Sequence, residues 1–313
     1  MKKNIGFWSS SNHLNTKIIP SIKNNINIIP YKLLTSKKNP THNNKYFLKT
    51  NITRNKIDFL NDKKFDTVYI SSISKNHFND CLDSLKFNKN IICEKPICEN
   101  EKDFQKLLSL SKKKKLRIYE IYQYVHHPLF LKIKELLKQK TIGKIKYIES
   151  SFKIPLNDKK NFRFQKKLGG GALMDVGAYP LSIPFFLFKN FKYSIIKKKI
   201  NISKKSKLDI SGQVLLNIKK NCICNFSWGF NSAYENYLKI TGIRGSIEAK
   251  FIFSKKISQA CELNVLINNN QKKIFIKEAN QINLAFNHFF NGTMDKKFNK
   301  ISSKLLKILN SIK

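Results

Sequence analysis

The first third of the chain alternates short apolar runs with helical patterns, and this alternation restricts the folds that it can adopt. The apolar runs that predict buried parallel strands occupy residues 4–8, 26–35, 66–73, 90–95 and 116–124. Apolar residues recur at helical spacing over 78–85 and again over 104–110, and Pro128 opens another such pattern that ends near Lys138. Strand–helix–strand alternation of this kind favours a doubly wound, parallel α/β sheet.

The pattern changes from about Gly143 onward. Segments with alternating apolar and polar residues, which predict strands of a mostly antiparallel sheet, occupy 144–154, 193–202, 209–218, 222–228, 237–241 and 246–253. An apolar helix ends near Phe188, and an amphipathic helix is predicted over 301–313. We therefore expect two domains, a doubly wound α/β domain over 1–122 and an α+β domain over 123–313.

The formal net charge of +40 raises the question of a nucleic-acid partner. Only four of the 60 basic residues are Arg, the usual reader of base edges, and the lysines are spread along the whole chain. Lys, Asn and Ile are all abundant, and A/T-rich codons encode these three residues. Codon composition therefore explains the charge better than a specific nucleic-acid site does, although a polyanion-binding or scaffolding protein stays an alternative. The positive field should also attract phosphorylated small molecules.

The remaining composition excludes several classes of protein. No apolar run approaches the length of a membrane-spanning helix, and the first residues lack the apolar region of a signal peptide. The six cysteines show no CxxC spacing, which predicts reduced, mostly buried thiols and no metal site. We expect a soluble, cytoplasmic protein without a membrane partner.

The stretch "LGGGALMDVGAYPLS", residues 168–182, concentrates glycine in a chain that has only 11 glycines. Three stand together at 169–171, where they let the backbone approach a ligand at a helix N-terminus. Asp175 and Tyr179 follow four residues apart, which places both side chains on one face of a helix. A second stretch, "ICEKPICEN", puts Lys95 at the carboxyl end of a predicted strand, where open α/β sheets bind their ligands.

Five motifs in order resemble the Gfo/Idh/MocA family, the relatives of glucose–fructose oxidoreductase and inositol dehydrogenase, over nearly the whole chain. They are "DTVYISSISKNH" ending at His77, "CEKP", "YEIYQYVHHP" with Glu120, His127 and Pro128, "NFRFQKKLGGGALMDVGAYPL" with Arg163, and "ITGIRGSIE". The resemblance implies an NAD(P)-binding Rossmann domain over 1–122 and a substrate-binding and oligomerisation domain over 123–313. It also implies a homo-oligomer that transfers a hydride between a nicotinamide coenzyme and a hydroxyl or keto group of a sugar or nucleotide sugar.

The resemblance assigns roles to individual residues as well. Lys95 and Tyr179 correspond to the catalytic pair, and Tyr at this position is typical of the branch with dihydrodiol dehydrogenase and nucleotide-sugar ketoreductases. Asp175, Arg163 and His127 would bind the substrate, although His127 before a proline is equally consistent with a helix cap. An ammonium within about 4–6 Å lowers the pKa of a phenol, which is ordinarily near 10, and makes proton exchange at neutral pH useful. A buried core phenol is the alternative for Tyr179.

The coenzyme site departs from the family pattern at its glycine loop. "IGFWSSSNHL" keeps Gly6 but has Ser9 at the second glycine position and Asn12 near the third. The second predicted strand ends in "LLTSKKN", without the acid that binds the ribose hydroxyls of NAD, which favours NADP over NAD. The expected coenzyme-binding residues are Gly6, Ser9, Asn12, Ser36, Lys37, Ser71, His77, Glu94 and Lys95. The eroded loop leaves open a degenerate family member that binds a sugar or phosphorylated ligand without redox chemistry.

Overall fold

A computed structural model describes residues 2–9, 11–37, 46–156, 158, 160–218, 221–292 and 295–313. The chain divides into two compact units. The first comprises Met1–Tyr122 together with Ile282–Leu306, and the second comprises Gln123–Gln281 together with Lys307–Lys313. In the described ranges, no helix is both long and apolar enough to cross a bilayer.

The first unit contains a six-stranded sheet in the order β3-β2-β1-β4-β5-β6, and all of its strands are parallel. The strands are β1 (Lys3–Trp8), β2 (Ile28–Leu34), β3 (Ile52–Thr53), β4 (Thr67–Ile70), β5 (Asn90–Glu94) and β6 (Ile118–Ile121). The predicted Rossmann-type sheet is thus confirmed. The strand order reverses between β1 and β4, the place where doubly wound sheets bind ligands at their carboxyl ends.

Short helices connect these strands. They are the π-helical turn η1 (Leu14–Ile18), α1 (Ile19–Ile22), α2 (Lys56–Asn61), α3 (His77–Lys86) and α4 (Glu101–Lys113). Asparagine caps two of them: Asn55 accepts from the N–H groups of Ile57 and Asp58, and Asn100 accepts from Asp103. The caps fix where α2 and α4 begin after the preceding turns.

Two helices from the end of the chain complete the first unit, namely α7 (Gln281–Asn291) and most of α8 (Asp295–Ile312). Phe286 of α7 contacts Tyr69 of β4 at 5.4 Å between ring centroids, and Phe298 of α8 contacts Tyr119 of β6 at 5.3 Å. The division drawn from the sequence assigned all residues after 122 to one domain. Residues 282–306 instead belong with the first unit, because their apolar faces bury aromatic side chains of its sheet.

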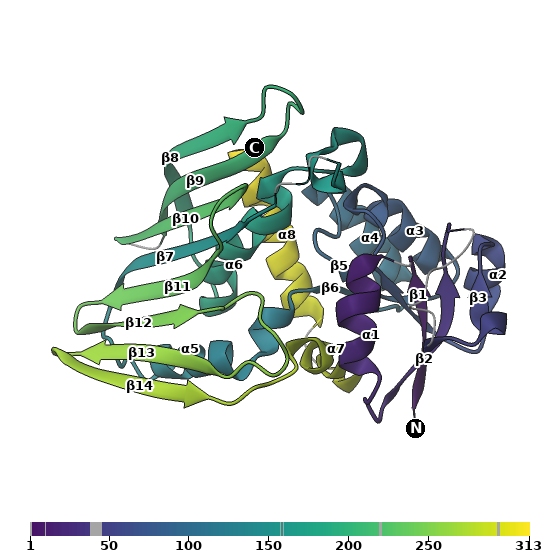
Figure 1. Cartoon of the computed structure of the whole chain (residues 1–313), viewed down its shortest axis with the longest axis horizontal. Coiled ribbons are helices and arrows are strands. Elements are labelled where there is room, and N and C mark those ends of the chain that lie inside the picture. The colour runs from purple at the N-terminus through teal and green to yellow at the C-terminus, as the bar shows by residue number, and fades with distance from the viewer. Residues whose placement is uncertain are drawn as a thin grey trace. The chain divides into compact units, whose positions relative to one another are not determined.

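The second unit contains an eight-stranded sheet in the order β14-β13-β12-β11-β7-β10-β9-β8 (Figure 1). The strands are β7 (Ile145–Ile154), β8 (Tyr193–Ile202), β9 (Asp209–Ile218), β10 (Cys222–Phe230), β11 (Glu235–Gly242), β12 (Gly245–Lys250), β13 (Cys261–Ile267) and β14 (Asn270–Ile276). Neighbours are antiparallel except for the parallel pair of β7 and β10, which confirms the predicted sheet type. The hairpin of β13 and β14 was not predicted.

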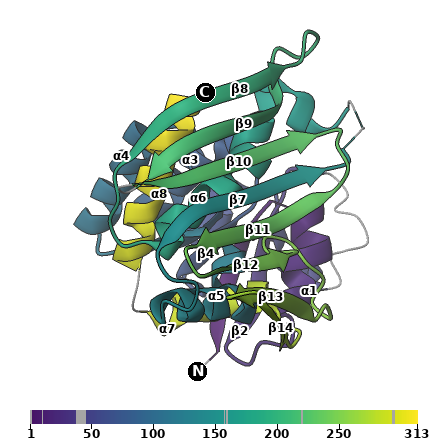
Figure 2. The ribbon, with the colours of Figure 1, turned by 90° about the vertical axis from the view of Figure 1, so that its left-hand side faces the viewer.

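Two helices accompany this sheet, α5 (Pro128–Lys138) and a long helical stretch made of η8 (Leu173–Gly177) and α6 (Ala178–Leu187). Figure 2 shows α6 on one face of the sheet, behind β7 and β10. Trp228 of β10 is completely buried and fixes this packing, because an added Cβ at Gly177 would lie 2.9 Å from its ring and one at Gly212 would overlap the ring from β9. The indole thus fills the space that two missing side chains leave.

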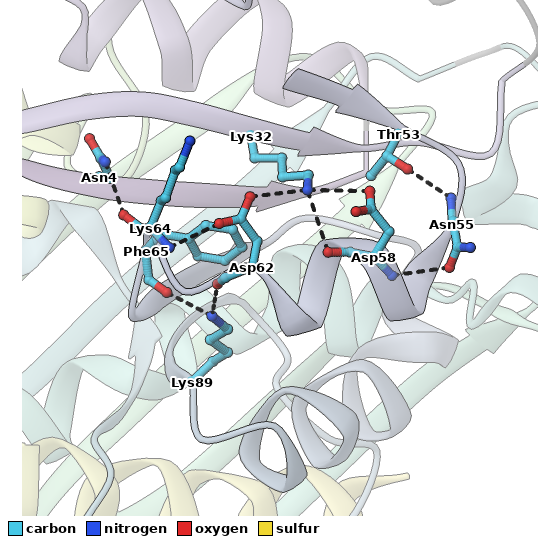
Figure 3. Close-up of polar contacts among 9 residues, drawn as sticks. All are labelled: Asn4, Lys32, Thr53, Asn55, Asp58, Asp62, Lys64, Phe65 and Lys89. Carbon is cyan, nitrogen blue, oxygen red and sulfur yellow. Dashed lines mark hydrogen bonds and ion pairs between the residues drawn. The ribbon is translucent and has the colours of Figure 1, made fainter. Parts of the chain in front are cut away.

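A cluster of polar contacts secures the turn that precedes β4 (Figure 3). Lys32 of β2 is 8% exposed, and its Nζ lies 3.0 Å from Oδ2 of Asp62 and 3.2 Å from Oδ2 of Asp58. Lys89, 3% exposed, donates to the carbonyl oxygens of Asp62 and Phe65 and lies 4.2 Å from the Phe65 ring centroid. Two buried ammonium groups therefore have partners in this turn, and Lys32 has a further one in α2.

Replacing Asp62 with Asn should destabilise the protein more than replacing Asp58 with Asn. Asp62 is mostly buried beside Lys32, whereas 53% of the Asp58 side chain is exposed to water. Removing the charge that faces a buried ammonium costs roughly 3 kcal/mol, while an exposed pair contributes less than about 1 kcal/mol. Urea unfolding at pH 7 measures both values, and equal losses would contradict this assignment.

The same comparison should depend on pH. Burial opposes ionisation of Asp62, but the Lys64 N–H and the Lys32 ammonium outweigh it and hold the pKa of that carboxyl below its usual range. A lowered pKa stabilises the folded state above the unfolded pKa, which is about 4, and that contribution is lost as the pH falls through the folded pKa. The difference between wild type and Asp62→Asn should therefore shrink below about pH 4.

Candidate active site

The carboxyl ends of β1, β2, β4 and β5 carry most of the residues predicted to bind the coenzyme. Ser9 follows β1 with a φ of +90°, a conformation that residues other than glycine rarely adopt, and its N–H donates to the carbonyl oxygen of Leu34 at 2.8 Å. The backbone at Ser9 therefore turns as a glycine would. This agrees with the prediction that Ser9 stands at a glycine position of the loop.

A helix begins directly after this loop. The Ser11 hydroxyl accepts from the N–H of Leu14 at 3.0 Å and donates to the Ser71 hydroxyl, at the end of β4, at 3.3 Å. Asn12 is exposed in the first turn. The turn widens to the π-type over η1 just before Pro20, which has no N–H to continue the ordinary helical pattern. Free N–H groups at such a helix start bind phosphate oxygens well.

Glu94 ends β5 and is held by two side chains that the sequence did not single out. The Tyr69 hydroxyl donates to Glu94 Oε1 at 2.6 Å, and His13 Nε2 lies 3.3 Å from the same oxygen. Burial opposes ionisation of Glu94, but His13, Tyr69 and Lys95 together hold the pKa of its carboxyl below its usual range. His13 lies in the first helical turn after the loop. Its contact with Glu94 could not be predicted from the sequence, because it depends on this turn lying beside the end of β5.

The turn at Lys95 is fixed from two sides. The Lys95–Pro96 peptide bond is cis, and the N–H of Ile97 donates to the buried carboxylate of Glu120 at 2.9 Å. The His77 ring lies 2.7 Å from the carbonyl oxygen of Pro96 and 2.9 Å from that of Ser72. Burial lowers the pKa of His77, so its neutral ring carries one proton and donates to one of the two carbonyls. In this structure His77 positions the turn that carries Lys95, and its predicted coenzyme contact stays a prediction.

Gly6 has a packing role within the protein. It lies inside β1, and a side chain there would overlap the Phe65 ring and lie 2.8 Å from Phe59. Ser36 and Lys37 follow β2 and are exposed. Lys38, which follows Lys37 in the stretch "LLTSKKN" that predicts NADP binding, lies outside the described residues.

In the second unit, Asp175 and Arg163 form an ion pair between Nε of Arg163 and Oδ2 of Asp175. Asp175 belongs to η8, where the helix opens to the π-type just before Pro180, and such widened turns are frequent at functional sites. The N–H of Gly171 donates to the Arg163 carbonyl at 3.0 Å, and a Cβ at Gly170 would overlap that carbonyl. The glycine run thus lets the backbone at Arg163 lie directly against the residues that precede η8.

Tyr179 is 8% exposed and lies among aromatic rings of the second unit. Its ring centroid is 5.2 Å from that of Phe152, 5.5 Å from Phe253 and 6.2 Å from Tyr124. The contact with Phe152 is edge-on and the other two are tilted, and aromatic contacts on several sides restrict the orientation of a ring. Asp175 and Tyr179 lie on one helical stretch made of η8 and α6, and their placement on one ligand-facing side of it stays a prediction.

His127 caps a helix. Its Nδ1 accepts from the N–H of Leu129 at 3.0 Å at the start of α5, and its side chain is completely buried. Burial, followed by the charge of Lys255, lowers the pKa of His127 to about 3, so the ring is neutral at physiological pH. The cap interpretation therefore describes what His127 does in the free protein, and its contact with substrate stays a prediction.

The predicted residues thus form two groups. Ser9, Ser71, Glu94, Lys95 and their neighbours belong to the first unit, and Arg163, Asp175, Tyr179 and His127 belong to the second. In each group a charged side chain is carried by a rigid turn or helix. Binding sites that are built on regular secondary structure have this feature.

Comparison with known families agrees with this arrangement. Residues 36–122 match the model of an oxidoreductase family with an NAD-binding Rossmann fold, and residues 130–248 match the GFO/IDH/MocA C-terminal domain. The chain belongs to the Gfo/Idh/MocA family. The resemblance drawn from its five motifs is confirmed.

Individual relatives add detail. The chain is 28% identical over 183 residues to dTDP-3,4-didehydro-2,6-dideoxy-alpha-D-glucose 3-reductase from Saccharopolyspora spinosa, which is 58% of this chain and 54% of that protein. It is 25% identical over 237 residues to trans-1,2-dihydrobenzene-1,2-diol dehydrogenase from Xenopus laevis, covering 75% of this chain and 68% of that enzyme. The match thus spans about half the length of the first relative and two thirds of the second.

Solved structures share the fold. KijD10, a 3-ketoreductase from Actinomadura kijaniata solved with NADP and TDP-benzene, superposes with a TM-score of 0.92. The two sequences are 16% identical, and the match covers 100% of this chain and 97% of that one. At this identity the likeness establishes the fold alone.

Replacing Ser9 with Gly should leave the unfolding free energy within about 1 kcal/mol of wild type or raise it, because glycine adopts a positive φ without strain. Ser9→Val puts a β-branched side chain at this φ and should lose roughly 1–3 kcal/mol. Asn88→Gly is the matched control, since Asn88 has a φ of +59° at the exposed end of α3. Chemical denaturation of the four proteins checks this, and a Val variant as stable as the Gly variant would show that Ser9 is unstrained.

Proposed function

We propose that the protein is an NADP-dependent oxidoreductase that transfers a hydride between the coenzyme and a hydroxyl or keto group of a sugar or nucleotide sugar. The observation that carries the proposal is the turn at Lys95. An ammonium group leaves the carboxyl end of β5 on a turn held by both Glu120 and His77. Such rigid placement of a charge at the ligand-binding edge of a doubly wound sheet suits a reacting group.

The residues of the first unit fit a dinucleotide. The glycine-like turn at Ser9 leads directly into a helix start, the kind of place where a pyrophosphate binds. The exposed Ser36 and Lys37 at the end of β2 suit the additional phosphate of NADP, since no acid stands there to bind ribose hydroxyls. KijD10 binds NADP, and D-xylose 1-dehydrogenase (NADP(+)) from Hypocrea jecorina is a further relative, 29% identical over 137 residues.

The chemistry divides between the two groups of residues. The bound coenzyme would supply or accept the hydride. Lys95 would stabilise the oxygen that gains negative charge, and Tyr179 would exchange the proton at that oxygen. Structures of KijD10 include variants in which one lysine or one tyrosine is replaced, which is consistent with a lysine and a tyrosine of interest in that enzyme.

The substrate would contact Asp175 and Arg163. Their ion pair presents a carboxylate acceptor and guanidinium donors together, the combination that binds the hydroxyl groups of a sugar. The dTDP-sugar 3-reductases among the relatives favour a nucleotide sugar. We also propose a homo-oligomer, in keeping with the family resemblance.

A ligand-binding member without redox chemistry is the second candidate. The observation that favours it is Ser9, whose side chain occupies the strained turn where a glycine would let a pyrophosphate approach more closely. Fluorescence titration with NADPH separates the two candidates, because the second would bind a sugar phosphate but no dinucleotide.

NADPH should bind more tightly than NADH, by roughly ten- to a hundredfold, because a charge-assisted bond to the additional phosphate contributes about 1.5–3 kcal/mol. Lys37→Asp should abolish or reverse this preference. Lys64→Asp makes the same charge change on an exposed lysine in the turn before β4, at the other end of the strands, and should leave the preference intact. Titrations at moderate salt measure the affinities for NADPH and NADH in the wild type and in each variant. Equal affinities of the wild type for both coenzymes would refute the assignment.

Lys95→Ala and Tyr179→Phe should each lower kcat by roughly 100-fold or more, the effect of losing a general acid–base group or its charge partner. Tyr179→Phe should still bind NADPH. Tyr124→Phe is the matched control: it removes a phenol whose ring contacts Tyr179, and whose hydroxyl bonds to Ser182 at 2.6 Å. That variant should lose stability and keep its kcat. Wild-type turnover by Tyr179→Phe would make Tyr179 a packing residue and leave His127 as the next candidate.

A further inference from the structure

The helical stretch that carries Asp175 and Tyr179 has no side-chain cap from its own segment. Instead, the N–H of Leu173 donates to Oδ2 of Asp209, which opens β9 36 residues later in the chain. A carboxylate at a helix start satisfies a free N–H and interacts favourably with the positive end of the helix dipole. The first turn of the helix is therefore tied to the sheet by one charged group.

The third glycine of the run makes this contact possible. Gly171 has a φ of +125°, and a Cβ there would lie 2.6 Å from Oδ1 of Asp209. Any side chain would push the carboxylate away from the helix. Gly171 thus admits a carboxylate of the protein itself, in addition to the ligand approach that the sequence suggested.

Trp228 joins the same arrangement. Its ring lies between Gly177 of the helix and Gly212 of β9, three residues beyond Asp209. In the described part of the chain its Nε1 has no hydrogen bond of ordinary geometry, yet its N–H lies near enough to Asp209 to favour the ionised carboxylate. The carboxylate and the indole together fix the start of the helix and its middle against β9 and β10.

The charge on Asp209 is kept at a cost to folding. Burial raises the pKa of its carboxyl, and the Leu173 N–H, the Trp228 N–H and the Lys313 ammonium oppose that effect without overcoming it. The folded protein therefore holds the Asp209 proton more tightly than the unfolded chain does, so that ionisation at neutral pH lowers stability. Retaining a group that costs stability is typical of functional positions.

We propose that Asp209 is a positioning residue for the reaction: it fixes the first turn of η8 and so sets how Asp175 and Tyr179 are presented to the substrate. Asp209 acts through the helix, and no contact with substrate is assigned to it. The inference rests on the proposed function for its kinetic consequence. The tie between Asp209 and the helix can be tested without turnover.

Asp209→Asn keeps the shape of the side chain and removes the charge. At pH 7 it should be as stable as wild type or more stable, because Asn cannot ionise, while kcat/KM should fall roughly tenfold or more, since small displacements of reacting groups are costly. Its affinity for NADPH should not change, because the coenzyme residues belong to the first unit. Val265→Ala, a truncation in the core of β13 away from the helix, is the control that should lose stability and keep kcat/KM.

Hydrogen exchange of residues 172–177 gives the second readout. Exchange there should be faster in Asp209→Asn than in wild type or Val265→Ala, and wild-type exchange should approach the variant's as acid protonates Asp209. Unchanged exchange, a wild-type kcat/KM in Asp209→Asn, or a parallel loss of stability and activity would each overturn the positioning role. Absence of NADPH turnover in the wild type would instead count against the proposed function, and the exchange comparison would still decide the role of Asp209.

Discussion

The packing of the second unit depends on Trp228, whose indole ring fills the space beside two glycines. Trp228 packs against the glycines at 177 and 212, so both the helix and β9 approach the indole closely. A buried ring of this size makes many small contacts, and its rigid plane permits few alternative packings. The orientation of the helix, and with it the direction of Asp175 and Tyr179, follows from where this ring lies.

The first unit reaches a similar result with polar contacts. Its reactive candidate, Lys95, is exposed in part, but the turn beneath it is secured by the buried carboxylate of Glu120 and the buried ring of His77. These partners come from different segments of the chain, on β6 and α3. Supporting groups of this kind restrict the position of a functional side chain more than its own backbone can.

Much of the secondary structure could be predicted from the sequence, because local patterns of apolar and polar residues determine it. β9 and α5 have the predicted bounds, since each shows one period from end to end, and β8 has them although its pairing with β9 shifts register between Ile195 and Lys197. The hairpin of β13 and β14 was not predicted. The burial of β13 alternates, and Asn268 and Asn269 form the turn of the hairpin with positive φ. Its outer strand is mostly exposed and rich in polar residues, so it lacks an apolar period.

The features that could not be predicted all join distant segments. The cap from Asp209, the contacts of His13 and Tyr69 with Glu94, and the packing glycine at position 6 each depend on which strands become neighbours. The motifs and the family resemblance predicted which residues would form the site. They could not separate the groups that meet a ligand from those that hold them, as His77 and His127 illustrate.

The discontinuous first unit has a consequence for how the protein is made. Its sheet is encoded in the first 122 residues, but Tyr69 and Tyr119 are covered by rings from residues 286–298, close to the end of the chain. During translation these apolar faces stay exposed until the ribosome has synthesised the residues up to 298. Domains of larger proteins usually fold in order from the N-terminus. Here the first unit is completed only after residues 123–281 of the second unit have been synthesised, so a nascent chain stopped before α7 would expose aromatic surface that a chaperone can recognise.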